Sequence, residues 1–151
     1  MQYAETVAAL GAIPLFSQLG TSTRKLLAFS SSYLSFHDGE NLFLQDAVSD
    51  SVYVIQEGCV DVIVVQEGEE VVVARMGRDD IVGEMGVFRN APRSATIRAV
   101  GSVQVIKIEA DVFIKAVTGD ADASLGVMRM LSDKLATMTV RYEKLKQGRE
   151  T

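Results

Sequence analysis

Cysteine is nearly absent from this chain, which has one among its 151 residues. The single Cys59 cannot form a disulfide within the chain, so the sequence fits a reducing, cytoplasmic setting. We interpret Cys59 as a small buried strand residue, since an isolated cysteine more often fills space in a core than acts as a reactive thiol.

Histidine is just as scarce, and this scarcity argues against a metal-dependent enzyme. His37 is the only one, in a turn beside Asp38, whereas a catalytic metal held in a β-roll needs several histidine ligands. The sequence also lacks Cys-rich metal spacing, a Ser–His–acid set and a P-loop. We therefore predict no metal, no cofactor and no enzymatic activity.

The sequence lacks the features of membrane and nucleic-acid-binding proteins as well. No apolar run approaches the roughly 20 residues of a spanning helix, and the N-terminus has no signal-peptide pattern. The net charge is −5 and the pI about 4.9, which argues against the clustered Lys and Arg that a phosphate backbone requires. The length predicts a single domain, residues 1–151, large enough to bury a core.

One segment, residues 81–97, combines donors and acceptors that suit a nucleotide. Residues 83–86 can open a short helical turn after a strand, and free backbone N–H groups at such a start attract anions. Arg93 offers a planar fork of donors that matches a phosphate. Glu84 can accept a hydrogen bond from a hydroxyl, such as the 2′-OH of a ribose. This combination indicates a nucleotide-binding site.

The same segment resembles the phosphate-binding cassette of the cyclic nucleotide-binding domain family, which includes catabolite activator protein and the regulatory subunits of protein kinase A. The usual cassette reads Phe-Gly-Glu-aliphatic-(Ala/Gly), a short spacer, then Pro-Arg-(Ala/Ser/Thr)-Ala-Thr. Val82 replaces the usual Phe, and the matching residues are Gly83, Glu84, Met85, Gly86, Pro92, Arg93, Ser94, Ala95 and Thr96. The resemblance implies Glu84 on the ribose 2′-OH and Arg93 on the cyclic phosphate. It also implies backbone N–H groups around Gly86 and Ser94 that complete the phosphate cradle.

Two of these residues have simpler alternative interpretations. Glu84 could lie in the first turn of a helix, where the dipole alone stabilises a carboxylate by about 0.3–1 kcal/mol. Arg93 could be a surface charge paired with Glu84. The small residues Ser94 and Ala95 leave space for a ligand near the backbone, which favours the binding interpretation for the set.

The rest of the chain predicts a mainly β fold with flanking helices. Residues 1–32 read as N-terminal helices, and Leu26, Leu27 and Phe29 are expected to face the core. Residues 33–109 contain about seven short strands broken by tight turns, which is typical of a double-stranded, jelly-roll-like β-roll.

Turn residues set the expected limits of the strands. We expect a turn at Glu57-Gly58 between strands 52–56 and 60–66, and a hairpin at Gly101-Ser102 between strands 94–100 and 103–108. Asp46 stands where the family more usually has Gly, and we expect it to alter a surface turn and leave the site alone.

Residues 110–148 predict two C-terminal helices, a short one and a long one from 121 to about 147. Along the long helix, apolar residues recur in steps of three and four, at Met128, Leu131, Leu135, Met138, Tyr142 and Leu145. Such a seam packs against a partner helix, which favours a homodimer. The alternative is a helix laid back on its own roll, which would bury only the first half of the seam.

The resemblance also places the base of the nucleotide between the roll and the long helix. Val62 and Val73 match strand positions that line the base, although ordinary core valines would look the same. Met138, Thr139 or Arg141 could cap the base, and Thr139 could bond an exocyclic amine.

The sequence therefore predicts a cyclic nucleotide sensor, for cAMP more than cGMP, that acts through the long helix on a partner or on an attached or separate effector domain. The alternative is a ligand-free roll that serves as a protein-interaction or dimerisation module. One branch of the family joins this domain to a helix-turn-helix, for which the chain has no room, so DNA binding by this chain alone is not expected.

Overall fold

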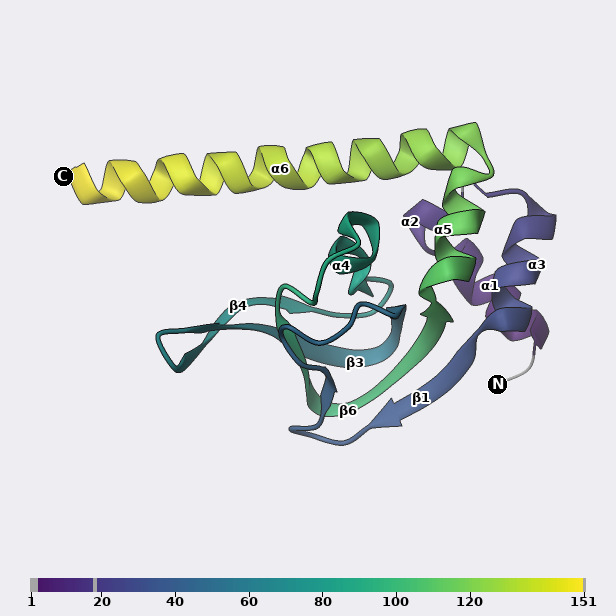
Figure 1. The fold of residues 1–151 in the computed structure, drawn as a ribbon, viewed down its shortest axis with the longest axis horizontal. Coiled ribbons are helices and arrows are strands. Elements are labelled where there is room, and N and C mark those ends of the chain that lie inside the picture. Colours follow the sequence, from purple (N-terminus) through teal and green to yellow (C-terminus); the bar gives the residue numbers. More distant parts are fainter. Residues whose placement is uncertain (1–2, 18, 151) are drawn as a thin grey trace.

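A computed structural model describes residues 3–17 and 19–150 (Figure 1). Residues 1–2, 18 and 151, which the predicted domain also includes, lie outside the described residues. The elements follow in the order α1 (Tyr3–Gly11), α2 (Pro14–Ser17), α3 (Thr21–Ser30), β1 (Ser32–Phe36), β2 (Asn41–Phe43), β3 (Ser51–Gln66), β4 (Glu69–Met76), β5 (Ile81–Val82), α4 (Glu84–Arg89), β6 (Thr96–Glu109), α5 (Ala110–Thr118) and α6 (Ala121–Glu150).

All strand pairs are antiparallel, and two long strands hold the sheet together. β3 and β6 pair along most of their length, and the strand order is β1-β6-β3-β4, with β2 on β6 and β5 on β3. Figure 1 shows this sheet curled into a roll, with α1, α2, α3 and α5 gathered at one end and α6 leading away from them. The predicted mainly β fold with flanking helices is confirmed.

Two expected strand breaks are wrong. β3 runs without a turn through Gly58, and β6 runs without a hairpin through Gly101. Both glycines have positive φ, 88° and 71°, and β3 pairs with β6 on either side of them, with a shift of register between Ile55 and Cys59. The glycines therefore bend two paired strands together, because a bulge rather than a turn absorbs their conformation.

The core has two parts that meet at β3 and β6. One lies inside the roll, around Ile55, Val60 and Val105. The other lies at the helical end, where Phe113 of α5 is fully buried between Phe16 and Phe88, with ring centroids 6.1 and 5.3 Å away. This second part attaches the helices to the roll.

The expected core face of α3 is partly wrong. Leu27 is buried as predicted, but Leu26 and Phe29 are 58% and 81% exposed. α3 packs on α1 and α5 through Leu27 and Ala28. Leu26 and Phe29 are three residues apart and share the opposite face of the helix.

Helix α6 is anchored at its start and exposed beyond it. Ala123 and Val127 are buried in the helical part of the core, and Leu131 packs against it. The remaining seam residues are 62–68% exposed: Met128, Leu135, Met138, Tyr142 and Leu145. Of the six residues of the predicted seam, all of them within the described part of the chain, only Leu131 packs against the chain's own core.

Candidate functional site

The cassette begins with a backbone turn that only glycine adopts without strain. Gly83 has φ 89° between β5 and α4, and a Cβ here would lie 2.5 Å from Arg93 Nη1 and 3.2 Å from the Phe43 ring. α4 then starts at Glu84 and ends at Arg89. Glycine thus allows the guanidinium of Arg93 to pack directly against the cassette backbone.

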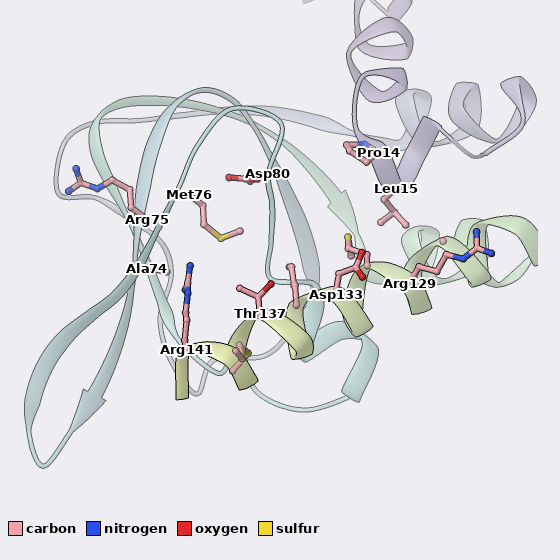
Figure 2. A pocket seen from close by; sticks show the side chains of 14 residues that line it. Pro14, Leu15, Ala74, Arg75, Met76, Asp80, Arg129, Asp133, Thr137 and Arg141 are labelled. Carbon is pink, nitrogen blue, oxygen red and sulfur yellow. The ribbon is translucent and has the colours of Figure 1, made fainter. Parts of the chain in front are cut away.

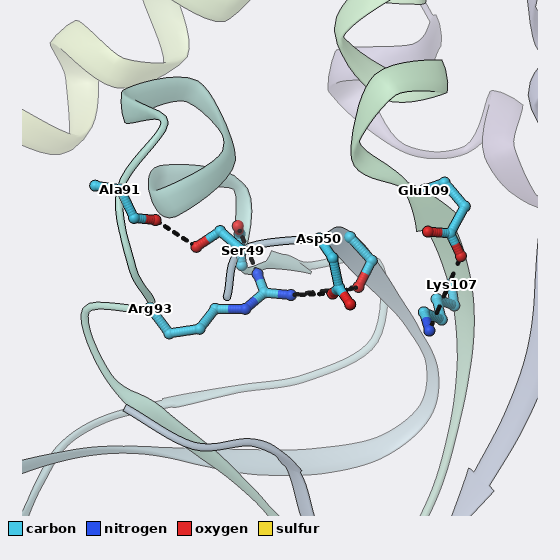
Figure 3. A network of polar contacts seen from close by, with 8 residues as sticks. Ser49, Asp50, Ala91, Arg93, Lys107 and Glu109 are labelled. Atoms are coloured by element: carbon cyan, nitrogen blue, oxygen red, sulfur yellow. Dashed lines mark hydrogen bonds and ion pairs between the residues drawn. The ribbon is translucent and has the colours of Figure 1, made fainter. Parts of the chain in front are cut away.

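Arg93 is a buried charge held from several sides. The residue is 3% exposed, and its Nη1 donates to the Gly83 carbonyl at 3.0 Å. Its Nη2 lies 3.3 Å from Ser51 Oγ and 3.4 Å from Asp50 Oδ1, and Figure 3 shows the Arg93 side chain pointing toward Asp50. The guanidinium carbon also lies 3.9 Å from the centroid of the Phe43 ring, a cation–π contact.

Burial lowers the pKa of Arg93 below its usual value, and Tyr53 and Asp50 oppose that shift. The guanidinium still stays charged at physiological pH, because an arginine in a protein does not lose its proton. Its Nε finds no hydrogen-bond partner among the described residues. Arg93 therefore offers a desolvated positive charge with a donor to spare, which suits an anionic ligand.

The turn around Asp46 supports Arg93 through backbone hydrogen bonds that a Gly at this position would also make, so the expectation that Asp46 leaves the site alone stays a prediction. The Asp46 N–H donates to the Arg93 carbonyl, and the Arg93 N–H donates to Ala47, both at 2.9 Å. Nearby, Ser49 Oγ donates to the Ala91 carbonyl at 2.6 Å (Figure 3). Asp46 has φ 72°, a conformation that Gly adopts freely and Asp tolerates.

One interpretation of the sequence paired Arg93 with Glu84 as a surface charge. The structure describes both residues and does not show this pair. The Glu84 carboxylate is 5% exposed and accepts a hydrogen bond from Lys134 Nζ of α6 at 2.9 Å, through Oε1. Glu84 and Arg93 thus have different protein partners, Lys134 for Glu84 and Asp50 for Arg93. Both residues line one cavity.

This cassette cavity has a volume of about 360 Å³. Nine of the ten residues predicted for the site line it: Val62, Val73, Gly83, Glu84, Met85, Gly86, Arg93, Ser94 and Ala95. Thr139 does not line it, and its hydroxyl donates to the Leu135 carbonyl within α6 at 2.9 Å. The α6 residues that do line it are Lys134, Met138 and Arg141.

Sequence reasoning missed Phe43 and Lys134 altogether. Phe43 lies on a short strand 50 positions before Arg93, and nothing local to it indicates a cationic neighbour. Lys134 lies four and seven residues before Met138 and Arg141, on the same face of a helix. That spacing was the available signal, once α6 was expected to cover the site.

The sequence model of the cyclic nucleotide-binding domain family matches residues 33–120, more than half of the chain. The chain belongs to this family. The match begins within β1 and includes the other strands, the cassette and α5. The family is a regulatory one rather than a catalytic one.

Curated relatives with the same domain are regulatory subunits of cAMP-dependent protein kinase. The chain is 32% identical to that of Mycosarcoma maydis over 90 residues, which are 60% of this chain and 17% of the relative. It is 30% identical to that of Blastocladiella emersonii over 116 residues, 76% of this chain and 29% of the relative. The chain thus spans less than a third of the length of these relatives.

Solved structures share the fold. The sensor domain of the transcriptional regulator DNR from Pseudomonas aeruginosa aligns with a TM-score of 0.82 at 21% identity, over 91% of this chain and 93% of that one. The regulatory domain of Toxoplasma gondii protein kinase A, crystallised with cAMP, aligns with a TM-score of 0.77 at 20% identity, over 89% and 50%. The regulatory subunit of a cAMP-independent protein kinase A from Trypanosoma brucei aligns with the same TM-score at 25% identity, over 87% and 47%.

Beside the cassette cavity, this member of the family has a second hollow of about 700 Å³ between α6, α2 and β4. The two share Ala74, Met76, Lys134, Met138 and Arg141. Figure 2 shows the Arg141 side chain extending from α6 toward Ala74 of β4. α6 therefore forms one wall of a groove that is continuous with the cassette.

Across the described part of the chain, no helix combines the length and apolar character needed to cross a membrane. Among the same residues, no three His, Cys, Asp or Glu side chains gather as ligands for a metal ion.

Proposed function

We propose that this domain binds a cyclic nucleotide, cAMP in preference to cGMP, and regulates a partner without catalysing a reaction. The observation that carries the proposal is the buried guanidinium of Arg93, which faces the same 360 Å³ cavity as the buried carboxylate of Glu84. Ligand cavities commonly measure about 300–1,000 Å³, so the volume suits a small ligand such as a mononucleotide.

In this proposal Arg93 binds the exocyclic oxygens of the cyclic phosphate and Glu84 accepts the ribose 2′-OH. Backbone N–H groups around Gly86 and Ser94 complete the phosphate cradle, and Met85 and Ala95 also line the cavity. Ser94 is exposed and leaves room for a ligand there.

The base would lie against Val62 and Val73, toward α6. Met138 and Arg141 face the cavity and support a role in covering the base. A contact from Thr139 requires a different position of α6, because its hydroxyl is bonded within the helix and exposed here.

The preference for cAMP draws on the relatives, since regulatory subunits of cAMP-dependent protein kinase share this domain. The same proposal includes a cytoplasmic site of action. It also includes a kinase-type effector, either attached to this domain or on a separate chain. One structure with the same fold is the regulatory subunit of a cAMP-independent protein kinase A from Trypanosoma cruzi, bound to guanosine. A nucleoside is therefore a necessary competitor in any binding test.

The response to the ligand would pass through α6. The apolar core holds the helix near its start, and three residues farther along it line the cassette cavity, so a ligand there would contact the part of the helix that lies outside the core. A ligand shifts that position only as far as it binds one arrangement better than the other.

The test is calorimetric titration of ligand-stripped protein with cAMP, cGMP and guanosine. We expect one-to-one binding, tightest for cAMP and weakest for guanosine, which lacks the phosphate that Arg93 binds. Arg93→Ala should weaken cAMP binding by a factor of at least about 30, because a buried charged contact contributes roughly 2–5 kcal/mol. Arg93→Lys should also weaken binding, since Lys lacks the planar fork.

Arg98→Ala is the matched control, because Arg98 lies nearby on β6 but pairs with Glu70 and Asn41 outside the cavity. Each variant is first checked for folding by thermal denaturation, since Arg93 also supports the cassette. Near wild-type cAMP affinity in folded Arg93→Ala would overturn the site. No heat with any of the three ligands would overturn the function.

A second candidate function rests on the exposed seam of α6. Its residues beyond Leu131 are more than 60% exposed. The surface through which a dimerisation module contacts its partner is exposed in the same way when the chain is alone. Light scattering after size exclusion, with and without cAMP, separates the two. A homodimer whose stability responds to cAMP supports the sensor, whereas a constitutive dimer that binds no nucleotide supports the interaction module.

A further inference from the structure

A lysine from α6 reaches the carboxylate that we assign to ribose recognition. Lys134 Nζ lies 2.9 Å from Glu84 Oε1, and the two residues are 50 positions apart in the chain. Of the ion pairs among residues 3–17 and 19–150, this one alone joins α6 to the cassette. It therefore connects the ligand site to the helix that would respond.

The burial of Glu84 makes this pair different from an ordinary surface salt bridge. The Glu84 side chain is 5% exposed and that of Lys134 is 43% exposed. A buried carboxylate without a partner is costly, whereas exposed pairs contribute little. Arg93, the buried cation of the cassette, is bonded instead to Gly83, Ser51 and Asp50, so it does not supply the counter-charge for Glu84.

The charges also suggest why an anionic ligand needs Lys134. Glu84 and Lys134 both line the cassette cavity, and a cyclic phosphate would bring another negative charge into it. With Lys134 in place the carboxylate is neutralised locally, so Glu84 can serve as an acceptor without repelling the ligand. The lysine bonds one carboxylate oxygen, Oε1, and a carboxylate has acceptor capacity on both oxygens.

We infer that Lys134 is a positioning residue for ribose recognition, which holds Glu84 by Oε1, leaves Oε2 for the 2′-hydroxyl and ties occupancy of the site to the placement of α6. This inference rests on the proposed function. The ligand and α6 then stabilise each other, because both need the same orientation of one carboxylate.

The test compares two ligands that differ only in the hydroxyl that Glu84 would bind, cAMP and 2′-deoxy-cAMP. Lys134→Met removes the charge and keeps much of the length, and Lys144→Met is the matched control, since Lys144 is an exposed lysine of the same helix that lines neither hollow. We expect Lys134→Met to weaken cAMP about tenfold and 2′-deoxy-cAMP less than about threefold, which is a loss of the preference for the hydroxyl.

Two results would overturn the inference. An equal loss for both ligands would mean that Lys134 acts on the phosphate or on the fold, and tighter binding of cAMP would mean that the lysine competes with the ribose for Glu84. Lys144→Met should leave both affinities unchanged.

A readout without ligand separates this inference from the proposed function. If Lys134 ties α6 to the cassette, amide hydrogen exchange in α6 around residues 134–141 and in α4 should be faster in ligand-free Lys134→Met than in Lys144→Met. Equal amide exchange in the two variants would overturn the inference that Lys134 connects α6 to the cassette, whatever ligand the protein binds. If the wild type binds no nucleotide, the role of Lys134 in ribose recognition fails together with the proposed function. Faster amide exchange in Lys134→Met than in Lys144→Met would then still show that Lys134 connects α6 to the cassette.

Discussion

The cassette and the second half of α6 differ in how firmly the rest of the chain holds them. Arg93 is bonded through its side chain to Gly83, Ser51 and Asp50, and through its backbone to Asp46 and Ala47. In α6, the apolar residues from Leu135 onward are exposed, and Lys134 supplies the helix's ion pair to the cassette. The groups proposed to recognise the ligand are therefore preorganised, whereas the second half of the helix keeps an exposed apolar face.

This difference indicates that ligand specificity can reside in the cassette and the conformational response in α6. A buried, multiply bonded arginine does not have to be ordered when the ligand arrives, so little binding energy is lost to ordering it. A helix with an exposed seam can move without breaking a core. The four predictions below test this contrast, from the largest expected effect to the smallest.

Phe113→Ala should remove the attachment between roll and helices. The ring is fully buried against Phe16 and Phe88, and large-to-small changes of a core Phe cost about 3–5 kcal/mol. Urea denaturation measures this loss in the free energy of unfolding. Phe29→Ala, at a ring that is 81% exposed, should change it by less than about 0.5 kcal/mol. Similar losses at the two positions would contradict the assignment of the core.

Gly83→Ala should damage the cassette selectively. Its φ of 89° strains an alanine by about 1–2 kcal/mol, and the new methyl group would collide with Arg93 and Phe43. Gly39→Ala is a matched control, because Gly39 has φ 83° but open space where the Cβ would be. We expect both variants to lose stability, and only Gly83→Ala to lose cAMP affinity in addition. Equal affinities in the two variants would mean that Arg93 does not need its packed position.

Tyr33→Phe should weaken the contact between β1 and α1. It should also make the free energy of unfolding less dependent on pH in the alkaline range. The Tyr33 hydroxyl lies 2.6 Å from Thr6 Oγ1, and such a hydrogen bond contributes about 0.5–1.5 kcal/mol. Burial raises the pKa of Tyr33 above its usual 10.0, so the folded state holds the phenolic proton more tightly than the unfolded chain.

The stability that this proton contributes is complete below pH 10 and is lost as the pH rises through the folded-state pKa. Urea denaturation of the wild type and of Tyr33→Phe at pH 8, 10 and 11 measures the difference. The gap between the two proteins should narrow as the pH rises, and a gap that widens would contradict the direction of the shift.

Leu135→Ala should leave the free energy of unfolding of a monomer almost unchanged, within about 0.5 kcal/mol, because the side chain is 64% exposed. If α6 pairs with a second chain, the same change should lower the melting temperature most at high protein concentration. Melting at two concentrations, a hundredfold apart, distinguishes these cases. A large loss at low concentration would show that α6 packs on its own roll.

Much of the site could be predicted because its signals are local. A glycine that must take positive φ, a following Glu, and an Arg among small residues occur within residues 83–95, where the backbone alone keeps them near one another. The strand ends were harder to predict. Gly58 and Gly101 look like turn residues in sequence, yet they bend β3 and β6, because the pairing of these strands continues past both glycines.

The sequence by itself determined the family, the mainly β fold and the chemistry of the cassette, since these depend on residue types at short, regular spacings. The tertiary structure alone decided that Phe43 packs on Arg93, that the turn at Asp46 carries the Arg93 backbone, and that Lys134 reaches Glu84. Each of these contacts joins residues about 50 positions apart. Which distant residues meet is decided by how the whole roll and its helices pack, and no local pattern of residues encodes it.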